Sequence, residues 1–348
     1  MADRSLTMLE AVREALFQAM GRDERVLVIG EDVVGGAGRG APYEGTMGGT
    51  FGATKGLYEE FGANRVRDTL ISEAGMTGIA VGAAAAGLRP VVDLMWSSFT
   101  LLAADQIVNQ AAKMSYMFGG QVQVPLVLRM AIGAGLGAAG QHSDTYYSIF
   151  THIPGLKVVT PTSPVDAKGL LLAAIEDPNP VLMMEHMGLY NTRGDVPEDY
   201  YTIPLGTAKI VRPGEDVTLI AVGFMVKLAT SAADELGQDG ISVEVIDPRT
   251  LSPLDTDALV ESARKTGRVI VIDESPPRCS IGADIAATVS ELAFDSLRGP
   301  IRRINAPHSP VPLSPSLERA YIPSKERIIA EVRRTLGAKA ASNETPAP

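Results

Sequence analysis

The sequence predicts two α/β domains in tandem, and three observations support this. Short apolar segments alternate with longer segments of helical periodicity, a polar stretch at residues 191–215 interrupts the alternation once, and the 348-residue length suits two domains. Apolar strands that alternate with helices indicate parallel sheets covered on both faces. We therefore predict a first domain at residues 1–190, a linker at 191–215, a second domain at 216–338 and a disordered tail at 339–348.

The first domain opens with a helix that is followed by a strand and a long loop. Thr7 and Glu10 have the spacing of a capping box, and apolar residues from Leu9 onward mark one helical face. The stretch at residues 35–56 is rich in glycine and lacks a clear period, which predicts a loop of the kind that is usually functional or disordered. Strands are expected at Val26–Ile29, Val91–Trp96, Pro125–Met130, Lys157–Thr160 and Val181–Glu185.

Two more helices complete the first domain, and a regular second domain follows. Apolar spacing predicts one helix over Phe99–Met117, and Ser163 with Pro164 begins another that ends near Ile175. Beyond the linker, strands are expected at Val217–Val222, Val243–Ile246, Val269–Asp273 and Ile301–Ile304, with helices near residues 225–236, 256–265, 282–296 and 324–336.

Composition narrows the class of protein. A net charge of −10 argues against a broad nucleic-acid surface, which would need a basic face, and gives no support for an anionic membrane. The single cysteine, Cys279, cannot form an internal disulfide, so a reducing cytoplasm is the expected location. No apolar run reaches the roughly 18 residues of a membrane span. We expect a cytoplasmic globular protein with no nucleic-acid or membrane partner.

A glycine-rich segment, Gly135–Gly140, fits the dinucleotide pattern G-x-G-x-x-G and follows an expected strand. A dinucleotide fold also needs a helix at the glycines and an acid about 20 residues further on, at the end of the next strand. Here a polar run follows the glycines, and the next strand ends at Thr160-Pro161. The pattern favours a flexible loop that lets backbone approach a ligand.

His142 stands out among the histidines because it lies in this polar, glycine-rich region. Spacing alone favours a surface loop histidine, although such a loop can also present a proton donor to a cleft. The run His142-Ser143-Asp144 does not predict a hydrolase triad, whose members come from separate elements. The histidines also lack the spacing of a catalytic zinc site.

Glu73 lies between an apolar segment and a helix of very small residues, Gly75–Gly87. An acid at the start of a helix can simply stabilise the positive end of the helix dipole. It can equally act on a ligand in a cleft, and the residue pattern leaves both interpretations open.

Seven segments, taken in order and at their spacing, carry a family resemblance that extends from Leu9 to about Leu336. They are Ile71–Gly75, Gly87–Val91, Asp105–Ile107, Tyr116–Gly120, Gln141–Ser143, Pro154–Val159 and Asp166–Leu170. The chain resembles the β subunits of the thiamine-diphosphate-dependent, transketolase-like first component of 2-oxo-acid dehydrogenase complexes, of the pyruvate or acetoin type. This resemblance implies a pyrimidine-type thiamine-diphosphate-binding domain followed by a transketolase C-terminal-like domain.

The same resemblance implies roles for individual residues. Glu73 matches a glutamate that hydrogen-bonds the aminopyrimidine ring, favours its imino tautomer and so promotes loss of the thiazolium C2 proton. His142 matches a histidine that manages protons during acyl transfer to the lipoyl group of the second component. Phe99 matches an aromatic residue near the pyrimidine, and Ile71 is expected to contact the cofactor.

Ions and partners are also implied by the resemblance. Family members bind potassium with carbonyls and polar side chains, and a plain helix end before Pro178 is the alternative. The matching positions are Leu126, Ala174, Ile175, Asp177 and Asn179. The family's Gly-Asp-Gly-plus-asparagine motif is missing, since Gly194-Asp195-Val196 lacks the rest. The expectation is an α₂β₂ heterotetramer whose α subunit holds the diphosphate and Mg²⁺, with a lipoyl-bearing acyltransferase as a further partner.

Departures from the pyruvate members bear on the substrate. Those members usually carry glutamine where this chain has Asp144, an acid expected to affect the proton exchange of His142. Residues 147–154 and 247–255 look more like the acetoin-cleaving branch. We expect thiamine-dependent cleavage of acetoin or decarboxylation of pyruvate with reductive acylation of lipoyl groups, active only with an α subunit. The alternatives are a branched-chain 2-oxo-acid dehydrogenase β subunit, a non-catalytic scaffolding relative and, disfavoured by length, a single-chain transketolase relative.

Overall fold

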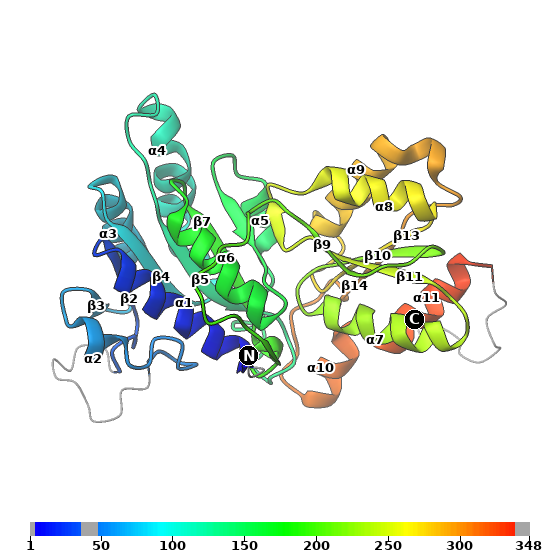
Figure 1. The fold of residues 1–348 in the computed structure, drawn as a ribbon, viewed down its shortest axis with the longest axis horizontal. Helices are drawn as coiled ribbons and strands as arrows, with labels where there is room; N and C mark the ends of the chain where they lie inside the picture. The colour runs from blue at the N-terminus through cyan, green and yellow to red at the C-terminus, as the bar shows by residue number, and fades with distance from the viewer. Residues whose placement is uncertain (1–3, 36–47, 338–348) are drawn as a thin grey trace. The chain divides into compact units, whose positions relative to one another are not determined.

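A computed structural model describes residues 4–35 and 48–337 of the chain. These residues form two compact units, each built on its own main sheet (Figure 1). The first unit runs to Thr207 and also takes in Arg249–Leu254 and Pro310–Arg319, and the second unit holds the remainder. The predicted tandem α/β architecture is confirmed.

The first unit contains a seven-stranded sheet in the order β12-β6-β7-β5-β4-β2-β3. The strands are β2 (Val26–Gly30), β3 (Val66–Asp68), β4 (Arg89–Trp96), β5 (Val127–Ile132), β6 (Lys157–Val159), β7 (Val181–His186) and β12 (Thr250–Ser252). All neighbours pair in parallel except β12, which runs antiparallel to β6. The expectation of an all-parallel sheet is therefore wrong at this edge. With three residues, β12 is too short to show a pattern in the sequence, and as an edge strand it pairs with a single neighbour.

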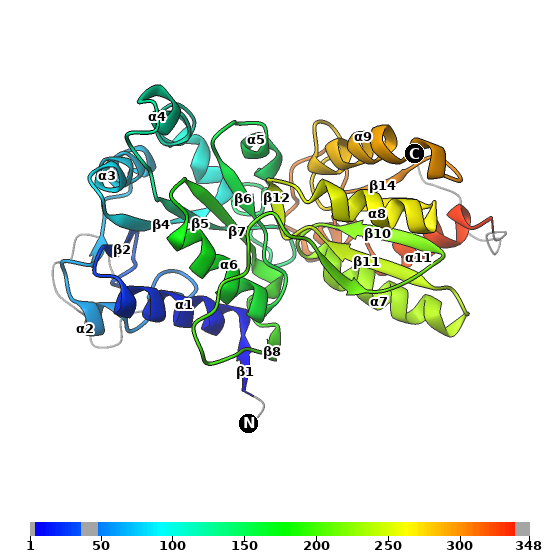
Figure 2. The same cartoon turned by 45° about the horizontal axis from the view of Figure 1, so that its top comes forward.

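Helices cover both faces of this sheet. In Figure 2, α1 (Met8–Arg22) and α6 (Pro164–Glu176) lie on one side of the sheet, and α3 (Glu73–Ala85) and α4 (Ala112–Met117) lie on the other. The predicted capping box of α1 is present, and Ser163 caps α6 with proline in its first turn. The short helices α2 (Leu57–Phe61), α5 (Tyr147–Thr151) and η3 (Met187–Leu189) complete the unit's covering layers.

The single helix predicted over Phe99–Met117 is wrong. The segment divides into a 3₁₀ turn, η1 (Ser97–Leu101), a π-helical turn, η2 (Gln106–Ala111), and α4. Apolar spacing records which face is buried but not where the hydrogen-bond pattern changes. In the first turn the Thr100 hydroxyl donates to the Ser97 carbonyl, a local bond that competes with the helical pattern. Such π turns are frequent at functional sites.

The second unit contains a five-stranded sheet in the order β14-β13-β10-β11-β9. Its strands are β9 (Lys209–Arg212), β10 (Val217–Ala221), β11 (Val243–Asp247), β13 (Val269–Asp273) and β14 (Arg302–Asn305). Its helices are α7 (Met225–Gln238), α8 (Thr256–Thr266), α9 (Ile281–Ala293), η4 (Phe294–Ser296) and α11 (Lys325–Thr335), while α10 (Pro315–Tyr321) begins in the part of the chain assigned to the first unit. An apolar core formed by α7, α11 and the central strands holds the sheet together. Only β9 is antiparallel, again at an edge.

The segment at residues 191–215, predicted as a linker, contains secondary structure. Within it, β8 (Arg193–Asp195) pairs with β1 (Ser5–Thr7), and β9 joins the second sheet. The predicted tail at residues 339–348 and most of the predicted glycine-rich loop lie outside the described residues. Among the helices that are described, none is long and apolar enough to cross a membrane.

Candidate functional site

The carboxyl edge of the seven-stranded sheet collects the residues singled out from the sequence. Strands β3, β2, β4 and β5 are neighbours in parallel register, so the segments that follow them leave at one edge. Glu73 follows β3, Phe99 follows β4 and His142 follows β5. Ligands of parallel α/β sheets bind outside this edge. The topology therefore brings the three candidates to the place where such a fold binds its ligands.

Glu73 is the first residue of α3, behind Ser72, whose hydroxyl accepts a hydrogen bond from the Gly75 amide at 3.3 Å. Since Ser72 caps the helix, the Glu73 carboxylate is not needed for that purpose. Only 9% of Glu73 is exposed, and no group within the described residues donates a hydrogen bond to its carboxylate. A nearly buried carboxylate in this state has its acceptor capacity available for a ligand.

A second acid, Glu31, lies beside Glu73 and was not singled out from the sequence. It comes directly after β2, at the same edge of the sheet. Burial, and after it the negative charges of Asp32 and Glu73, raise the pKa of Glu31. The edge thus carries two coupled carboxyl groups, a pattern common at functional sites. Sequence spacing gave no signal for this pair, because the two residues follow different strands.

Large apolar side chains are exposed in the segment that precedes Glu73 and on α3, η1 and α4. Ile71, predicted to contact a cofactor, is 69% exposed, and Leu70 is 78% exposed. Further exposed apolar residues on η1, α3 and the end of α4 are Ile79, Leu101, Leu102, Tyr116, Met117 and Phe118. We call these eight residues the apolar surface. Apolar exposure concentrated on neighbouring elements marks an interaction surface rather than a solvated one.

A strained turn at the end of β4 aims aromatic side chains at this edge. The pairing of β4 with β5 shifts register between Asp93 and Trp96, which is the signature of a β-bulge. Within the bulge Met95 has a φ of 60°, and its amide donates to the Asp93 carboxylate at 3.0 Å. A non-glycine residue in the left-handed region is held there by its surroundings, often at functional sites. Trp96 is the last residue of β4 and pairs with Ala131 beyond the bulge, and η1, which carries Phe99, begins directly after it.

His142 is enclosed by two of these rings. Its imidazole lies 4.5 Å from the Trp96 ring centroid and 5.6 Å from that of Phe99, both in edge-on arrangements. Phe51 packs on the other side of Trp96 at 5.6 Å. Within the described residues, the Trp96 indole nitrogen and the Ser143 hydroxyl are buried without a hydrogen-bond partner. Buried polar atoms in that state usually serve a ligand or an ordered water.

Asp144 fastens the segment that carries His142. Its carboxylate accepts a hydrogen bond from the Ser98 hydroxyl at 2.6 Å, and its main-chain carbonyl accepts one from Ser97 at 2.6 Å. Burial, followed by the charge of Asp144, raises the pKa of Tyr146. The observed contacts of Asp144 therefore tie the loop to η1. Its expected effect on the proton exchange of His142 stays a prediction.

An ion network lies under the aromatic rings. The Arg129 guanidinium donates to both oxygens of Glu185, at 3.0 and 2.7 Å, and also pairs with Asp93. Although burial opposes it, the charges of Asp93 and Glu185 raise the pKa of Arg129, so the side chain stays charged. Burial raises the pKa of Tyr190, whose ring lies 4.9 Å from that of Phe51. Because Asp93 also receives the Met95 amide, the network supports the strained turn directly.

The sequence of this chain matches two protein-family models and several curated proteins. Residues 4–193 match the family described as the transketolase pyrimidine binding domain, and residues 206–328 match the transketolase C-terminal domain. The chain is 54% identical to the acetoin:2,6-dichlorophenolindophenol oxidoreductase subunit beta of Bacillus subtilis (strain 168), over 96% of this chain and 98% of the relative. The chain belongs to the family of transketolase-type dehydrogenase β subunits. The resemblance read from the sequence is thereby confirmed.

Other members of this β-subunit family are also similar. A Cupriavidus necator protein with the same acetoin name is 50% identical over 96% of this chain and 98% of its own length. The pyruvate dehydrogenase E1 component subunit beta of Rickettsia felis is 45% identical over 94% of this chain and 98% of its own length. A solved structure described as a split gene transketolase, inactive beta4 tetramer, has a TM-score of 0.74 at 20% identity, covering 96% of this chain and 99% of that one, which shows the shared fold.

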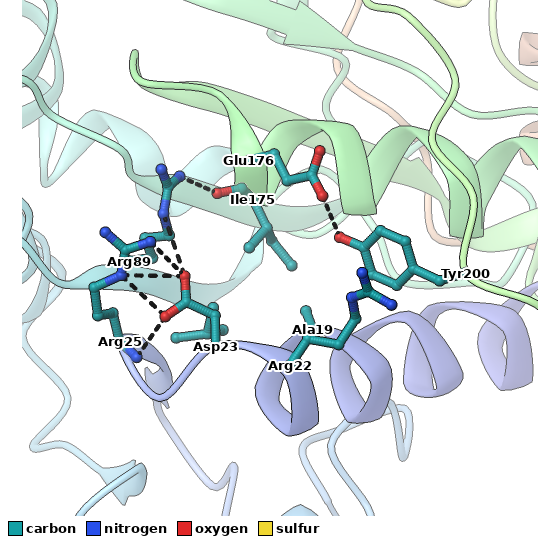
Figure 3. A pocket seen from close by; sticks show the side chains of 9 residues that line it. Ala19, Arg22, Asp23, Arg25, Arg89, Ile175, Glu176 and Tyr200 are labelled. Carbon is teal, nitrogen blue, oxygen red and sulfur yellow. Dashed lines mark hydrogen bonds and ion pairs between the residues drawn. The ribbon is translucent and has the colours of Figure 1, made fainter.

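The five residues matched to the family's potassium site lie where α6 ends and β7 begins, with Leu126 just before β5. Two cationic side chains already contact the end of α6. Arg89 donates to the Ile175 carbonyl at 2.6 Å, and Lys157 pairs with Asp177. Figure 3 shows Arg89 between the Ile175 carbonyl and Asp23, beside a cavity of about 260 Å³. A carbonyl oxygen has two lone pairs, so Ile175 keeps one, and this donor set fits a potassium ion in kind.

Proposed function

We propose that this chain is the β subunit of a thiamine-diphosphate-dependent acetoin or 2-oxo-acid dehydrogenase and supplies the pyrimidine half of a cofactor site shared with an α subunit. One observation carries the proposal: Glu73 is nearly buried at the carboxyl edge of the first sheet, and within the described residues nothing donates to its carboxylate. The similarity to acetoin and pyruvate dehydrogenase β subunits supports the same assignment.

Glu73 fits the pyrimidine ring of thiamine diphosphate, with Phe99 beside it. When bound, this cofactor supplies the nucleophilic carbon that attacks the substrate carbonyl. The Glu73 carboxyl group holds a proton at a ring nitrogen of the pyrimidine, and the low dielectric constant of a nearly buried position strengthens that hydrogen bond. The Glu31 carboxyl group lies at the same edge, and burial, followed by the charges of Asp32 and Glu73, raises its pKa.

His142 is proposed to exchange protons while an acyl group passes to the lipoyl group of the second component. Trp96 and Phe99 hold its ring edge-on, and Asp144 fixes the segment that follows it. An imidazole side chain can both accept and donate a proton.

The apolar surface is proposed to face the α subunit. Its members Leu70 and Ile71 precede Glu73 directly in the sequence, so a chain bound over them would help to exclude water from the Glu73 carboxylate. The α chain is also proposed to hold the diphosphate and Mg²⁺, because the family's diphosphate motif is missing from this sequence. The assembly proposed is an α₂β₂ heterotetramer in the cytoplasm, with potassium at the end of α6.

Acetoin is the first substrate to test. The similarity to acetoin-named relatives, at 54 and 50%, exceeds the 45% similarity to the pyruvate-named relative. A 2-oxoisovalerate dehydrogenase subunit beta of Bacillus subtilis (strain 168) is 40% identical over 94% of this chain, which keeps the branched-chain alternative in the test. The reconstituted αβ pair should therefore be assayed with acetoin, pyruvate and 2-oxoisovalerate, using 2,6-dichlorophenolindophenol as electron acceptor.

Replacement of Glu73 is the decisive variant. In the αβ complex, Glu73→Gln should lower dye reduction by about 10³-fold, because proton transfer by a positioned group contributes 10²–10⁴. The control Glu60→Gln changes an exposed acid on α2 and should leave turnover unchanged. Retained turnover in Glu73→Gln would remove this residue from the reaction. A wild-type complex that assembles but turns over none of the three substrates would instead favour the scaffolding alternative.

A further inference from the structure

The glycine-rich loop that carries His142 is fastened by an acid from far along the chain. Glu318, on α10, is only 4% exposed, and its carboxylate points at the loop. It accepts hydrogen bonds from the Gly135 amide at 2.7 Å and from the Gly137 amide at 3.0 Å. Glu318 and the two glycines all belong to the first unit, because this unit includes Pro310–Arg319. This contact spans 183 positions of the sequence.

The two amides that Glu318 binds belong to glycines of the G-x-G-x-x-G segment. Successive backbone amides that point to one place form an anion-binding concavity, as in phosphate-binding loops. Here that concavity is filled by the chain's own carboxylate. Hydrogen bonds from backbone amides to a carboxylate are charge-assisted, which makes them among the stronger bonds that can hold a loop.

The loop is fastened at both ends, with His142 between. At its start, Gly133 has a φ of +91°, and a Cβ added there would lie 1.9 Å from the His186 imidazole. Gly135 and Gly137 then bind Glu318, and beyond His142 the Asp144 carboxylate binds Ser98. These contacts hold the main chain on both sides of His142, whose ring lies against Trp96 and Phe99.

We propose that Glu318 is a positioning residue, which orders the loop of residues 133–142 and so holds His142 in the geometry needed for acyl transfer. The inference rests on the proposed function for the role of His142, but the contact itself does not. Loss of the carboxylate frees two amides and the loop between Gly133 and His142. Steps that need His142 should suffer more than steps that need only the bound cofactor.

The test uses the αβ complex with Glu318→Ala, Glu318→Gln and, as control, Arg319→Gln, the exposed neighbour on α10. Three quantities are measured: amide exchange of residues 133–142, dye reduction, and reductive acylation of a lipoyl domain. Glu318→Ala should speed loop exchange at least tenfold and lower lipoyl acylation about tenfold more than dye reduction. Glu318→Gln, which keeps a neutral acceptor, should give intermediate values in both measurements. Arg319→Gln should match the wild type.

Two results would overturn the inference. Unchanged exchange of the loop in a folded Glu318→Gln complex would show that the carboxylate does not order it. Equal losses in the dye and lipoyl assays would indicate a general structural role instead. A wild-type complex inactive in both assays would refute the proposed function, whereas the exchange measurement would still decide whether Glu318 orders the loop.

Discussion

The carboxyl edges of the two sheets differ in how their polar groups are used. In the second unit, the Asp273 carboxylate at the end of β13 accepts the Ser275 amide at 2.9 Å, the Ser275 hydroxyl at 2.6 Å and the Gly282 amide at 3.2 Å. In the first unit, Glu73 and the polar atoms of Trp96 and Ser143 have no such partners within the described residues. Two sheets of one class therefore have one edge that is satisfied internally and one that is left open for other molecules.

The largest effect on stability is expected at the satisfied edge. Asp273→Ala leaves three buried donors unpaired and should lower the free energy of unfolding of the second unit by about 3 kcal/mol. Glu291→Ala, an exposed change on α9, is the control. Urea unfolding followed by amide exchange in β13 measures both. If Asp273→Ala lowers the free energy of unfolding by less than Glu291→Ala does, the hydrogen bonds of Asp273 do not stabilise the second unit.

Potassium should stabilise the first unit alone. An ion that binds only the folded chain adds about 1.4 kcal/mol when its concentration is ten times the dissociation constant. The thermal midpoint should therefore be higher in potassium chloride than in tetramethylammonium chloride at equal ionic strength. Asp177→Ala should remove the difference. Equal midpoints for the wild type in both salts would indicate that no potassium ion joins Arg89 and Lys157 at the end of α6.

At the open edge of the first unit, we expect a substitution that raises the free energy of unfolding to lower activity. Ser143→Ala removes a buried hydroxyl that has no hydrogen-bond partner among the residues that the structure describes, so the free energy of unfolding should rise by about 1 kcal/mol. Dye reduction by the complex should fall, because a ligand or water loses that hydroxyl. Thr335→Val removes a similar unpartnered hydroxyl from α11 in the second unit and should stabilise without loss of turnover. Lower stability in Ser143→Ala would mean that the hydroxyl already has a partner.

Sequence reasoning succeeded where a signal is local. The capping box at Thr7, the proline start of α6 and the apolar runs predicted as strands all depend on neighbouring residues, and the structure has each of them. Glu73, Phe99 and His142 were found through the family resemblance, and the sheet then placed them at one edge. Their roles stay predictions.

What the sequence did not indicate depends on contacts between distant segments. Glu31 lies beside Glu73 only because β2 and β3 pair, and Arg129 meets Glu185 only because β5 and β7 pair. Glu318 reaches Gly135 from the other end of the chain. The antiparallel edge strand β12 was also not predicted, because a strand this short is recognised only by its pairing with β6. Periodicity and spacing in the sequence do not predict such contacts between distant residues.

The smallest effect concerns the carboxyl pair at the open edge and depends on pH. Because the pKa of Glu31 is raised in the folded chain, the folded state keeps this proton at pH values where the unfolded chain, with a pKa near 4.3, has lost it. In that window the folded state binds more protons, so the free energy of unfolding falls as pH rises, and the penalty is complete above the folded pKa.

Glu31→Gln removes this penalty. It should raise the free energy of unfolding by less than about 1 kcal/mol at pH 8, because the group is partly solvent-screened, and the gain should vanish below pH 4. The exposed control Glu60→Gln should show no such slope. A gain of equal size at both pH values would assign it to packing and would separate Glu31 from Glu73. A gain that grows with pH would show that the open edge holds a partly buried carboxyl group beside other negative charges at a cost in stability, which the second unit avoids by surrounding Asp273 with donors.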